Sequence, residues 1–332
     1  MTILVTGAAG FIGHALSAKL LARGDQVVGI DNLNDYYSVQ LKKDRLADLA
    51  ADGAGFTFHQ VDFSDAAALG TALKGHRFDR VAHMGAQPGV RYSVTHPDAY
   101  ARANLVGHLN ILEFCRHTDG LKHLVYASSS SVYGGNTKLP FSVDDRTDRP
   151  VSLYAATKRA GELMSESYSH LYRLPQTGLR FFTVYGPWGR PDMTPWLFTE
   201  AILAGRPIKL FNNGEISRDF TYIDDIVDGV VRALDQPPPD DGKRKAGGSL
   251  GPHRLYNSGN NRSEPLRKLV ETIERATGKK ASIELAPAQP GDVKDTFADI
   301  AAIDQDLGYK PTTPLEIGIP KFVEWYRSYR RL

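Results

Sequence analysis

Short apolar runs alternate with longer amphipathic stretches through the first half of the chain. The runs at residues 3–6, 26–30, 56–61, 80–84, 123–127 and 177–182 predict six strands. Between them, residues 11–23, 98–117 and 153–172 predict helices of three or more turns. This alternation is typical of a buried parallel sheet with helices on both faces.

The pattern becomes irregular after about residue 184, where Gly, Pro and Trp interrupt the periodicity. A helix over 195–205 and an edge strand over 207–211 are predicted next, followed by shorter elements. A smaller second domain therefore begins near this point. Residues 236–253 are rich in Pro, Gly and charge, and predict an exposed, mobile loop without a function of its own.

Composition argues against several kinds of partner. The 332 residues carry 40 Lys+Arg and 38 Asp+Glu, a net charge of +2, without a block of like charges that would attract nucleic acid or a membrane surface. No apolar stretch is long enough to span a membrane, and the one cysteine, Cys115, favours a reducing compartment. We therefore expect a soluble cytoplasmic protein. The ten histidines form no metal-binding motif, so we expect no metal site.

A glycine-rich turn joins the first strand to the first helix. In "ILVTGAAGFIGHAL", Gly7, Gly10 and Gly13 allow a tight turn that brings backbone N–H groups and the helix N-terminus against a pyrophosphate. Asp31 ends the second strand, where a carboxylate binds the ribose 2′-OH of a dinucleotide. Together these features predict a dinucleotide site.

The surroundings of Asp31 favour NAD over NADP. Its carboxylate would repel a 2′-phosphate, and residues 32–34 offer no arginine to hold one. At the end of the third strand, Asp62 and Phe63 fit either of two roles. They could cap the adenine, or Asp62 could form a plain Asx turn.

The glycine spacing Gly-x-x-Gly-x-x-Gly resembles that of short-chain dehydrogenases/reductases. This resemblance implies a Ser or Thr at a later strand end, followed by Tyr-x-x-x-Lys. The stretch "SLYAATKRAGE" supplies Tyr154 and Lys158 on one helical face. A phenol with a reference pKa of about 10 acts as a base near neutrality only if positive charge favours the phenolate. Lys158 and the oxidised nicotinamide ring would provide that charge.

Four serines follow the fifth predicted strand in "YASSSSVYGG". A serine run alone is typical of a linker, but in the extended branch of the family the catalytic Ser/Thr lies four residues before the Tyr of Val-Tyr-Gly, which is Ser129 here. Ser130 and Ser131 occupy positions where related dehydratases and sugar-acid decarboxylases carry acids. Hydroxyls cannot replace those acids in proton transfer, but they can hydrogen-bond a carboxylate.

Five longer stretches, at 31–37, 89–93, 127–134, 170–193 and 218–230, resemble UDP-glucuronate 4-epimerases. The resemblance implies an extended Rossmann-type fold, with a doubly wound parallel sheet over 1–184, part of 219–258 returning to it, and a smaller α/β UDP-sugar domain over 185–332. It also implies an isomerase that holds NAD, interconverts UDP-glucuronate and UDP-galacturonate through a 4-keto sugar, and forms a homodimer.

The resemblance also assigns residues. Thr183 would contact the sugar or its carboxylate, Arg190 would hold the acidic end, and Arg218 would neutralise the diphosphate, with Gln289 and Asp292 near the uridine ribose. The implied catalytic residues are Ser129, Tyr154 and Lys158. The implied cofactor-binding residues are Gly7, Gly10, Phe11, Ile12, Gly13, Asp31, Asn32, Asp62, Phe63, Met84, Gly85, Ala86, Tyr154 and Lys158. The implied substrate-binding residues are Arg91, Ser129, Ser130, Ser131, Tyr154, Thr183, Arg190, Phe211, Arg218, Gln289 and Asp292.

Particular residues argue against three other functions for this chain. A UDP-hexose 4-epimerase for neutral sugars is opposed by the carboxylate-matched residues, and a UDP-sugar-acid decarboxylase by the absence of an acid after Ser129. A non-catalytic NAD-sensing protein is opposed by the intact Ser129, Tyr154 and Lys158. The chain departs from the family's usual Leu-Ala-Ala-Gln-Ala at Met84, Gly85 and Pro88.

Overall fold

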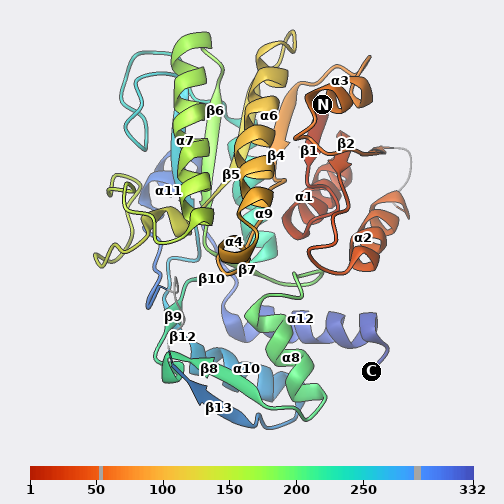
Figure 1. The fold of residues 1–332 in the computed structure, drawn as a ribbon, viewed down its shortest axis with the longest axis vertical. Coiled ribbons are helices and arrows are strands. Elements are labelled where there is room, and N and C mark those ends of the chain that lie inside the picture. Colours follow the sequence, from red (N-terminus) through yellow and green to blue (C-terminus); the bar gives the residue numbers. More distant parts are fainter. Residues whose placement is uncertain (52–54, 288–292) are drawn as a thin grey trace.

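A seven-stranded parallel sheet forms the centre of the molecule (Figure 1). The computed structural model describes residues 1–51, 55–287 and 293–332. The strand order is β11-β6-β5-β4-β1-β2-β3, so the chain winds outward on both sides of β1, which confirms the predicted Rossmann-type fold. The strands are β1 (Thr2–Thr6), β2 (Gln26–Asp31), β3 (Phe56–Gln60), β4 (Arg80–His83), β5 (His123–Ser129), β6 (Gln176–Phe181) and β11 (His253–Ser258).

Helices cover both faces of this sheet because the strands carry apolar side chains on both faces. In β1, Ile3 and Val5 contribute to one core cluster and Leu4 to the other. The first cluster includes residues of α1 (Phe11–Ala22), α2 (Val39–Ala51), α9 (Ile223–Asp235) and α11 (Ala301–Leu307). The second includes residues of α3 (Ala66–Ala72) and α6 (Gly107–Arg116), and partly buried side chains of α7 (Leu153–Tyr172) pack against it.

The helix predicted over 98–117 is divided. Helices α4 (Tyr92–Thr95) and α5 (Pro97–Tyr100) precede a wider π-helical turn at Ala101–Val106, and α6 follows at once. Gly107 begins α6 in close contact with the loop after β3, since a Cβ there would lie 2.4 Å from a ring carbon of Phe63.

A second group of elements lies in the lower part of Figure 1. It includes short strand pairs that the irregular pattern after residue 184 did not resolve. The predicted strand 207–211 is found as β8, which pairs with β13. The elements are β7 (Thr183–Tyr185), α8 (Thr194–Leu203), β8 (Ile208–Phe211), β9 (Ser217–Arg218), β10 (Phe220–Tyr222), β12 (Glu264–Pro265), α10 (Leu266–Thr277), β13 (Ile283–Ala286) and α12 (Leu315–Arg330).

Two late segments join the sheet. Helix α9 packs on α1, and β11 pairs in parallel with β6. Residues 236–252 between them contain no helix or strand, but His253, which we assigned to this loop, begins β11. The expected exposure is wrong for Ser249, which is buried and hydrogen-bonds Glu166 at 2.8 Å. Within the described parts of the chain, no helix has the length and apolar character needed to cross a membrane.

Candidate active site

The glycine turn brings backbone segments closer than any side chain would allow. Gly7 has φ +69°, and a Cβ on it would lie 2.7 Å from the backbone of Gly85. A Cβ on Gly13 would lie 2.0 Å from the carbonyl oxygen of Gly7. Gly10 precedes α1 without a side-chain cap, and the first turn of α1 carries no acidic residue. The helix N-terminus is therefore suited to a phosphate anion, which fits the pyrophosphate of a dinucleotide.

Every predicted cofactor-binding residue lines one pocket at the carboxyl ends of the strands, which we call the inner pocket. Ser129 and Arg190 line it too. Gly85, one of the departures from the family pattern, lets its backbone pack closely against Phe63 and Gly7. A Cβ there would lie 2.7 Å from the Phe63 ring and 3.1 Å from the backbone nitrogen of Gly7.

Asp31 has a cationic neighbour that sequence reasoning missed. Lys42, on α2, lines the inner pocket, and its Nζ lies 4.0 Å from Oδ1 of Asp31 while donating a hydrogen bond to Asn34. Burial raises the pKa of Asp31, and the charge of Lys42 opposes this effect. Lys42 lies beyond residues 32–34, on the helix that follows them, where a lysine could also reach a 2′-phosphate.

Asp62 forms an Asx turn and also lines the inner pocket. Its carboxylate accepts hydrogen bonds from the backbone N–H of Ser64 at 2.8 Å and from the side chain of Asn32 at 3.2 Å, so the Asx turn is present. Asp62 and Phe63 also line the inner pocket, where an adenine could contact them.

The three predicted catalytic residues come together from β5 and α7. Ser152 caps α7, accepting a hydrogen bond from the N–H of Ala155 at 3.1 Å, and so places Tyr154 in the first turn. Tyr154 and Ser129 line the same inner pocket, and the Ser129 side chain acts to lower the pKa of the Tyr154 phenol. Lys158 lies one turn later and donates a hydrogen bond to the carbonyl of Ala127 at 2.9 Å.

Charge and burial act on these groups in opposite directions. Burial raises the pKa of the Tyr154 phenol, while its hydrogen bond with Ser129 and the positive charge of Arg190 lower it. Burial also lowers the pKa of Lys158 to about 8, and the charge of Glu162 opposes this shift. Sequence reasoning assigned the positive charge near Tyr154 to Lys158 and the nicotinamide. The structure adds Arg190.

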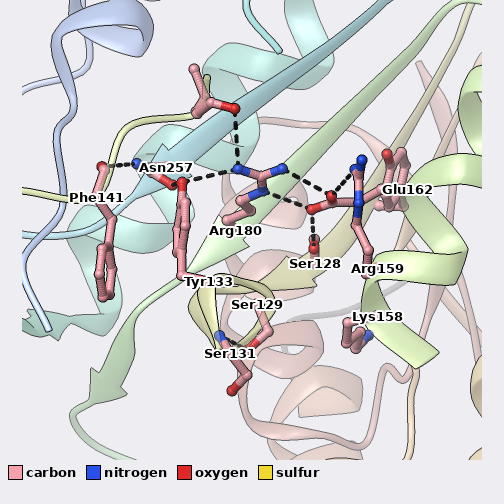
Figure 2. Close-up of polar contacts among 12 residues, drawn as sticks. Ser128, Ser129, Ser131, Tyr133, Phe141, Lys158, Arg159, Glu162, Arg180 and Asn257 are labelled. Carbon is pink, nitrogen blue, oxygen red and sulfur yellow. Dashed lines mark hydrogen bonds and ion pairs between the residues drawn. The ribbon is translucent and has the colours of Figure 1, made fainter. Parts of the chain in front are cut away.

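A buried polar network lies behind Lys158 (Figure 2). Glu162, one turn further along α7, accepts hydrogen bonds from Arg180 at 2.8 and 2.9 Å, from Arg159 at 2.8 Å and from Ser128 at 2.7 Å. Burial alone would raise the pKa of Glu162, but these charges and hydrogen bonds outweigh it and lower the pKa. Glu162 therefore stays ionised.

This network holds both ends of the serine turn. Ser128 is bonded to Glu162, and the hydroxyl of Tyr133 contacts Arg180 at 3.0 Å. Between them, Ser129 ends β5, and its hydroxyl accepts a hydrogen bond from the backbone N–H of Ser131 at 3.2 Å. Ser130 and Ser131 are partly exposed in a 3-10 turn over Ser130–Tyr133, and neither lines the inner pocket.

Five of the predicted substrate residues line a second pocket, the outer pocket, which has a volume of about 860 Å³: Arg91, Thr183, Arg190, Phe211 and Arg218. The guanidinium of Arg91 stacks 4.7 Å from the ring centre of Phe211, and Arg218 donates hydrogen bonds to the carbonyls of Ser217 and Lys294. The predicted residues Gln289 and Asp292 lie outside the described residues.

The chain matches the model of the NAD dependent epimerase/dehydratase family over residues 3–245. It is 48% identical to "UDP-glucuronate 4-epimerase 4" of Arabidopsis thaliana, over 99% of this chain and 76% of that protein. It is 46% identical to the "Probable UDP-glucuronate 4-epimerase" of Rhizobium meliloti, over 100% of this chain and 98% of that protein.

Among solved structures, the UDP-glucuronic acid 4-epimerase of Bacillus cereus, in complex with UDP-glucuronic acid and NAD, superposes with a TM-score of 0.87 and 32% identity. The alignment covers 99% of this chain and 100% of that one.

Proposed function

We propose that this chain, which belongs to the NAD-dependent epimerase/dehydratase family, catalyses the reversible C4 epimerisation of UDP-glucuronate to UDP-galacturonate. The family match and the named relatives confirm the predicted family and NAD as cofactor. They agree with the predicted class of enzyme, an isomerase.

The residues of the inner pocket fit NAD. The glycine turn would hold the pyrophosphate, and Asp31 the adenosine ribose. NAD, when bound, supplies the hydride acceptor and donor for C4 of the sugar.

The side chains around that position have distinct roles. Tyr154 takes the proton of the C4 hydroxyl and later returns it, and Ser129 positions that hydroxyl through its own hydrogen bonds. The charges of Lys158 and Arg190 favour the phenolate form of Tyr154 that this step needs. Because the proton and the reducing equivalents both return to the sugar, no net redox change occurs.

The observation that carries the proposal is the placement of Arg190. Its side chain lines both pockets, so it lies between the catalytic Tyr154 and the lining that contains Arg91 and Arg218. A UDP-sugar with its diphosphate near Arg218 would bring a C6 carboxylate toward Arg190. Thr183 lines the same outer pocket, and we propose it as a further donor to that carboxylate.

The test is to incubate the NAD-containing protein with UDP-glucuronate, UDP-galacturonate and UDP-glucose in turn and identify the products by NMR. We expect the two uronates to interconvert, with UDP-glucose turned over more slowly. Faster epimerisation of UDP-glucose would favour a neutral-sugar epimerase, and a pentose nucleotide with CO₂ would favour a decarboxylase. Tyr154→Phe is the matched control, since it removes only one hydroxyl.

We further propose that the enzyme is a cytoplasmic homodimer. Exposed apolar side chains on α7 and on the helical segment of residues 101–116 support a shared interface, namely Leu163 at 55% exposed, Val106 at 48% and Leu109 at 40%. Burial of such side chains in a partner would remove them from water. Light scattering should report a dimer, and Leu163→Glu should shift it toward monomer.

We propose residues 1–184 as the NAD-binding domain and 185–332 as the UDP-sugar domain, with part of 219–258 returning to the first. The pairing of β11 with β6 and the packing of α9 on α1 support the return.

A further inference from the structure

Arg190, Asp192 and Tyr36 form a hydrogen-bonded cluster where the inner and outer pockets meet. Tyr36 and Arg190 line both pockets, and Asp192 lines the outer one. Tyr36 comes from the loop after β2, whereas Arg190 and Asp192 come from the segment between β7 and α8. The cluster therefore connects the sheet to the elements below it.

Asp192 binds Arg190 along one edge of the guanidinium. Nε donates to Oδ1 at 3.0 Å, and Nη2 donates to Oδ2 at 2.5 Å. A guanidinium carries five N–H groups in a rigid plane. Asp192 engages two of them, the N–H of Nε and one N–H of Nη2, so the Nη1–Nη2 edge makes no bond to Asp192. That edge can receive a second carboxylate in the same bidentate way.

Tyr36 fixes the position of Asp192. Its hydroxyl donates to Oδ2 at 2.9 Å, and its ring lies against Tyr92 with the ring centres 4.8 Å apart. Gly89, with φ +100°, makes room for it, since a Cβ there would lie 2.5 Å from the Tyr36 hydroxyl. Asp192 is thus held from two sides, by Arg190 and by Tyr36.

Asp192 carries a lasting negative charge in this place. Burial acts to raise its pKa, but the charge of Arg190 and the hydrogen bonds from Arg190 and Tyr36 outweigh burial and lower it. Arg190 is therefore largely neutralised before any substrate binds. A neutral sugar then meets no uncompensated cation, and a carboxylate gains less than it would from an unpaired arginine.

We propose that Asp192 is a positioning residue that grips the Nε edge of Arg190 and leaves the Nη1 edge to the sugar carboxylate, and that its charge limits the preference for acidic over neutral UDP-sugars. This inference rests on the proposed function. It gives a role to Asp192, which lies two residues after Arg190 in the stretch 170–193 and was not among the predicted site residues.

Two variants separate charge from geometry. Asp192→Asn removes the charge and keeps one oxygen acceptor, whereas Asp192→Glu keeps the charge and moves the carboxylate by one methylene. For Asp192→Asn we expect a lower KM for UDP-glucuronate, a lower kcat, and a ratio of kcat/KM for UDP-glucuronate over UDP-glucose that rises about tenfold. For Asp192→Glu we expect a lower kcat with a ratio close to that of the wild type.

Tyr36→Phe should lower kcat less than either variant, because Arg190 still holds Asp192. If Asp192→Asn changes both substrates by the same factor, the charge does not act on specificity and the inference is wrong. It is equally wrong if both variants keep the wild-type kcat, since Asp192 would then not position Arg190.

Calorimetric titration of the same proteins with UDP-glucuronate, UDP-glucose and UDP measures the charge effect without turnover. Asp192→Asn should lower the dissociation constant of UDP-glucuronate and leave those of UDP-glucose and UDP unchanged. Wild-type protein that turns over neither sugar would contradict the proposed function, whereas an active wild type with no selective change in Asp192→Asn would contradict only this inference.

Discussion

Glu162 and Arg180 form a bidentate ion pair that is almost completely buried, with side chains 0% and 2% exposed. Glu162 lies one helical turn beyond Lys158 on α7, and Figure 2 shows its contacts with Arg180, Arg159 and Ser128. Each partner also makes a second hydrogen bond. Glu162 accepts one from Ser128, and Arg180 donates one to the hydroxyl of Tyr133. This ion pair thus also holds the residue before Ser129 and acts on the charge of Lys158, the serine and lysine that we propose as catalytic.

Replacing Glu162 should destabilise the fold strongly. Glu162→Gln leaves Arg180 charged without its buried partner, and breaking such a pair costs about 3–5 kcal/mol of the free energy of unfolding. Urea unfolding measures this loss. Arg159→Gln is the control, since its side chain is 30% exposed and we expect a loss of about 0–1 kcal/mol. Equal losses in the two variants would contradict this account.

Activity should fall on the alkaline side of neutrality. The pKa of Lys158 is lowered to about 8, so its charge is present below that pH and is lost as the pH rises through it. We therefore expect kcat/KM to decline above about pH 8 in a steady-state pH profile. Glu162 raises this pKa, so Glu162→Gln should move the decline to lower pH. A decline that stays in place would show that another group titrates.

Tyr154→Phe should lower turnover at least about 10²-fold, the lower range of general acid–base contributions, because the proton acceptor is lost. The variant should still retain NAD, since the pyrophosphate and ribose sites are untouched. Product NMR and the cofactor content of the purified protein measure the two effects. Near-normal epimerisation would rule out Tyr154 as the base.

Asp31→Ala should weaken the retention of NAD. It should also increase the retention of NADP, because Lys42 then lacks its counter-charge and can face a 2′-phosphate. Mass spectrometry of the cofactor released on denaturation gives both amounts, and Asp31→Ala combined with Lys42→Ala is the control. If the single variant excludes NADP as fully as the wild type, Asp31 does not decide between the cofactors.

The Arg190→Ala variant should release CO₂ from UDP-glucuronate during turnover. Oxidation at C4 of glucuronate gives a β-keto acid, which loses CO₂ readily when the bond from C5 to the carboxylate stands perpendicular to the ketone plane. One charge-assisted hydrogen bond is worth roughly 1.5–3 kcal/mol, so its loss should change the partition toward CO₂ by up to about a hundredfold. Single-turnover product analysis detects the 4-keto-pentose nucleotide. Ser130→Ala with Ser131→Ala tests whether the turn hydroxyls share this role. If these variants lose only the binding of UDP-glucuronate and release no CO₂, the residues do not restrain the carboxylate.

Much of the inner pocket could be predicted from local sequence. The glycine spacing, Asp31 at a strand end and the four-residue interval from Tyr154 to Lys158 each depend on a few neighbouring residues, because tight turns, strand ends and helical faces have short, regular periods. The strand and helix pattern likewise predicted the order of layers.

Other parts of the site depend on contacts between residues far apart in the chain. Tyr36 reaches Asp192 across 156 positions, and Lys42 meets Asp31 only because α2 folds back along the loop after β2. Local sequence carries no signal for the Tyr36–Asp192 pair, since an aspartate in a loop has many equally suitable partners. Packing of the second group of elements against the sheet selected among them. It placed Arg190 in the same pocket as Tyr154, where the positive charge of Arg190 acts to lower the pKa of the phenol.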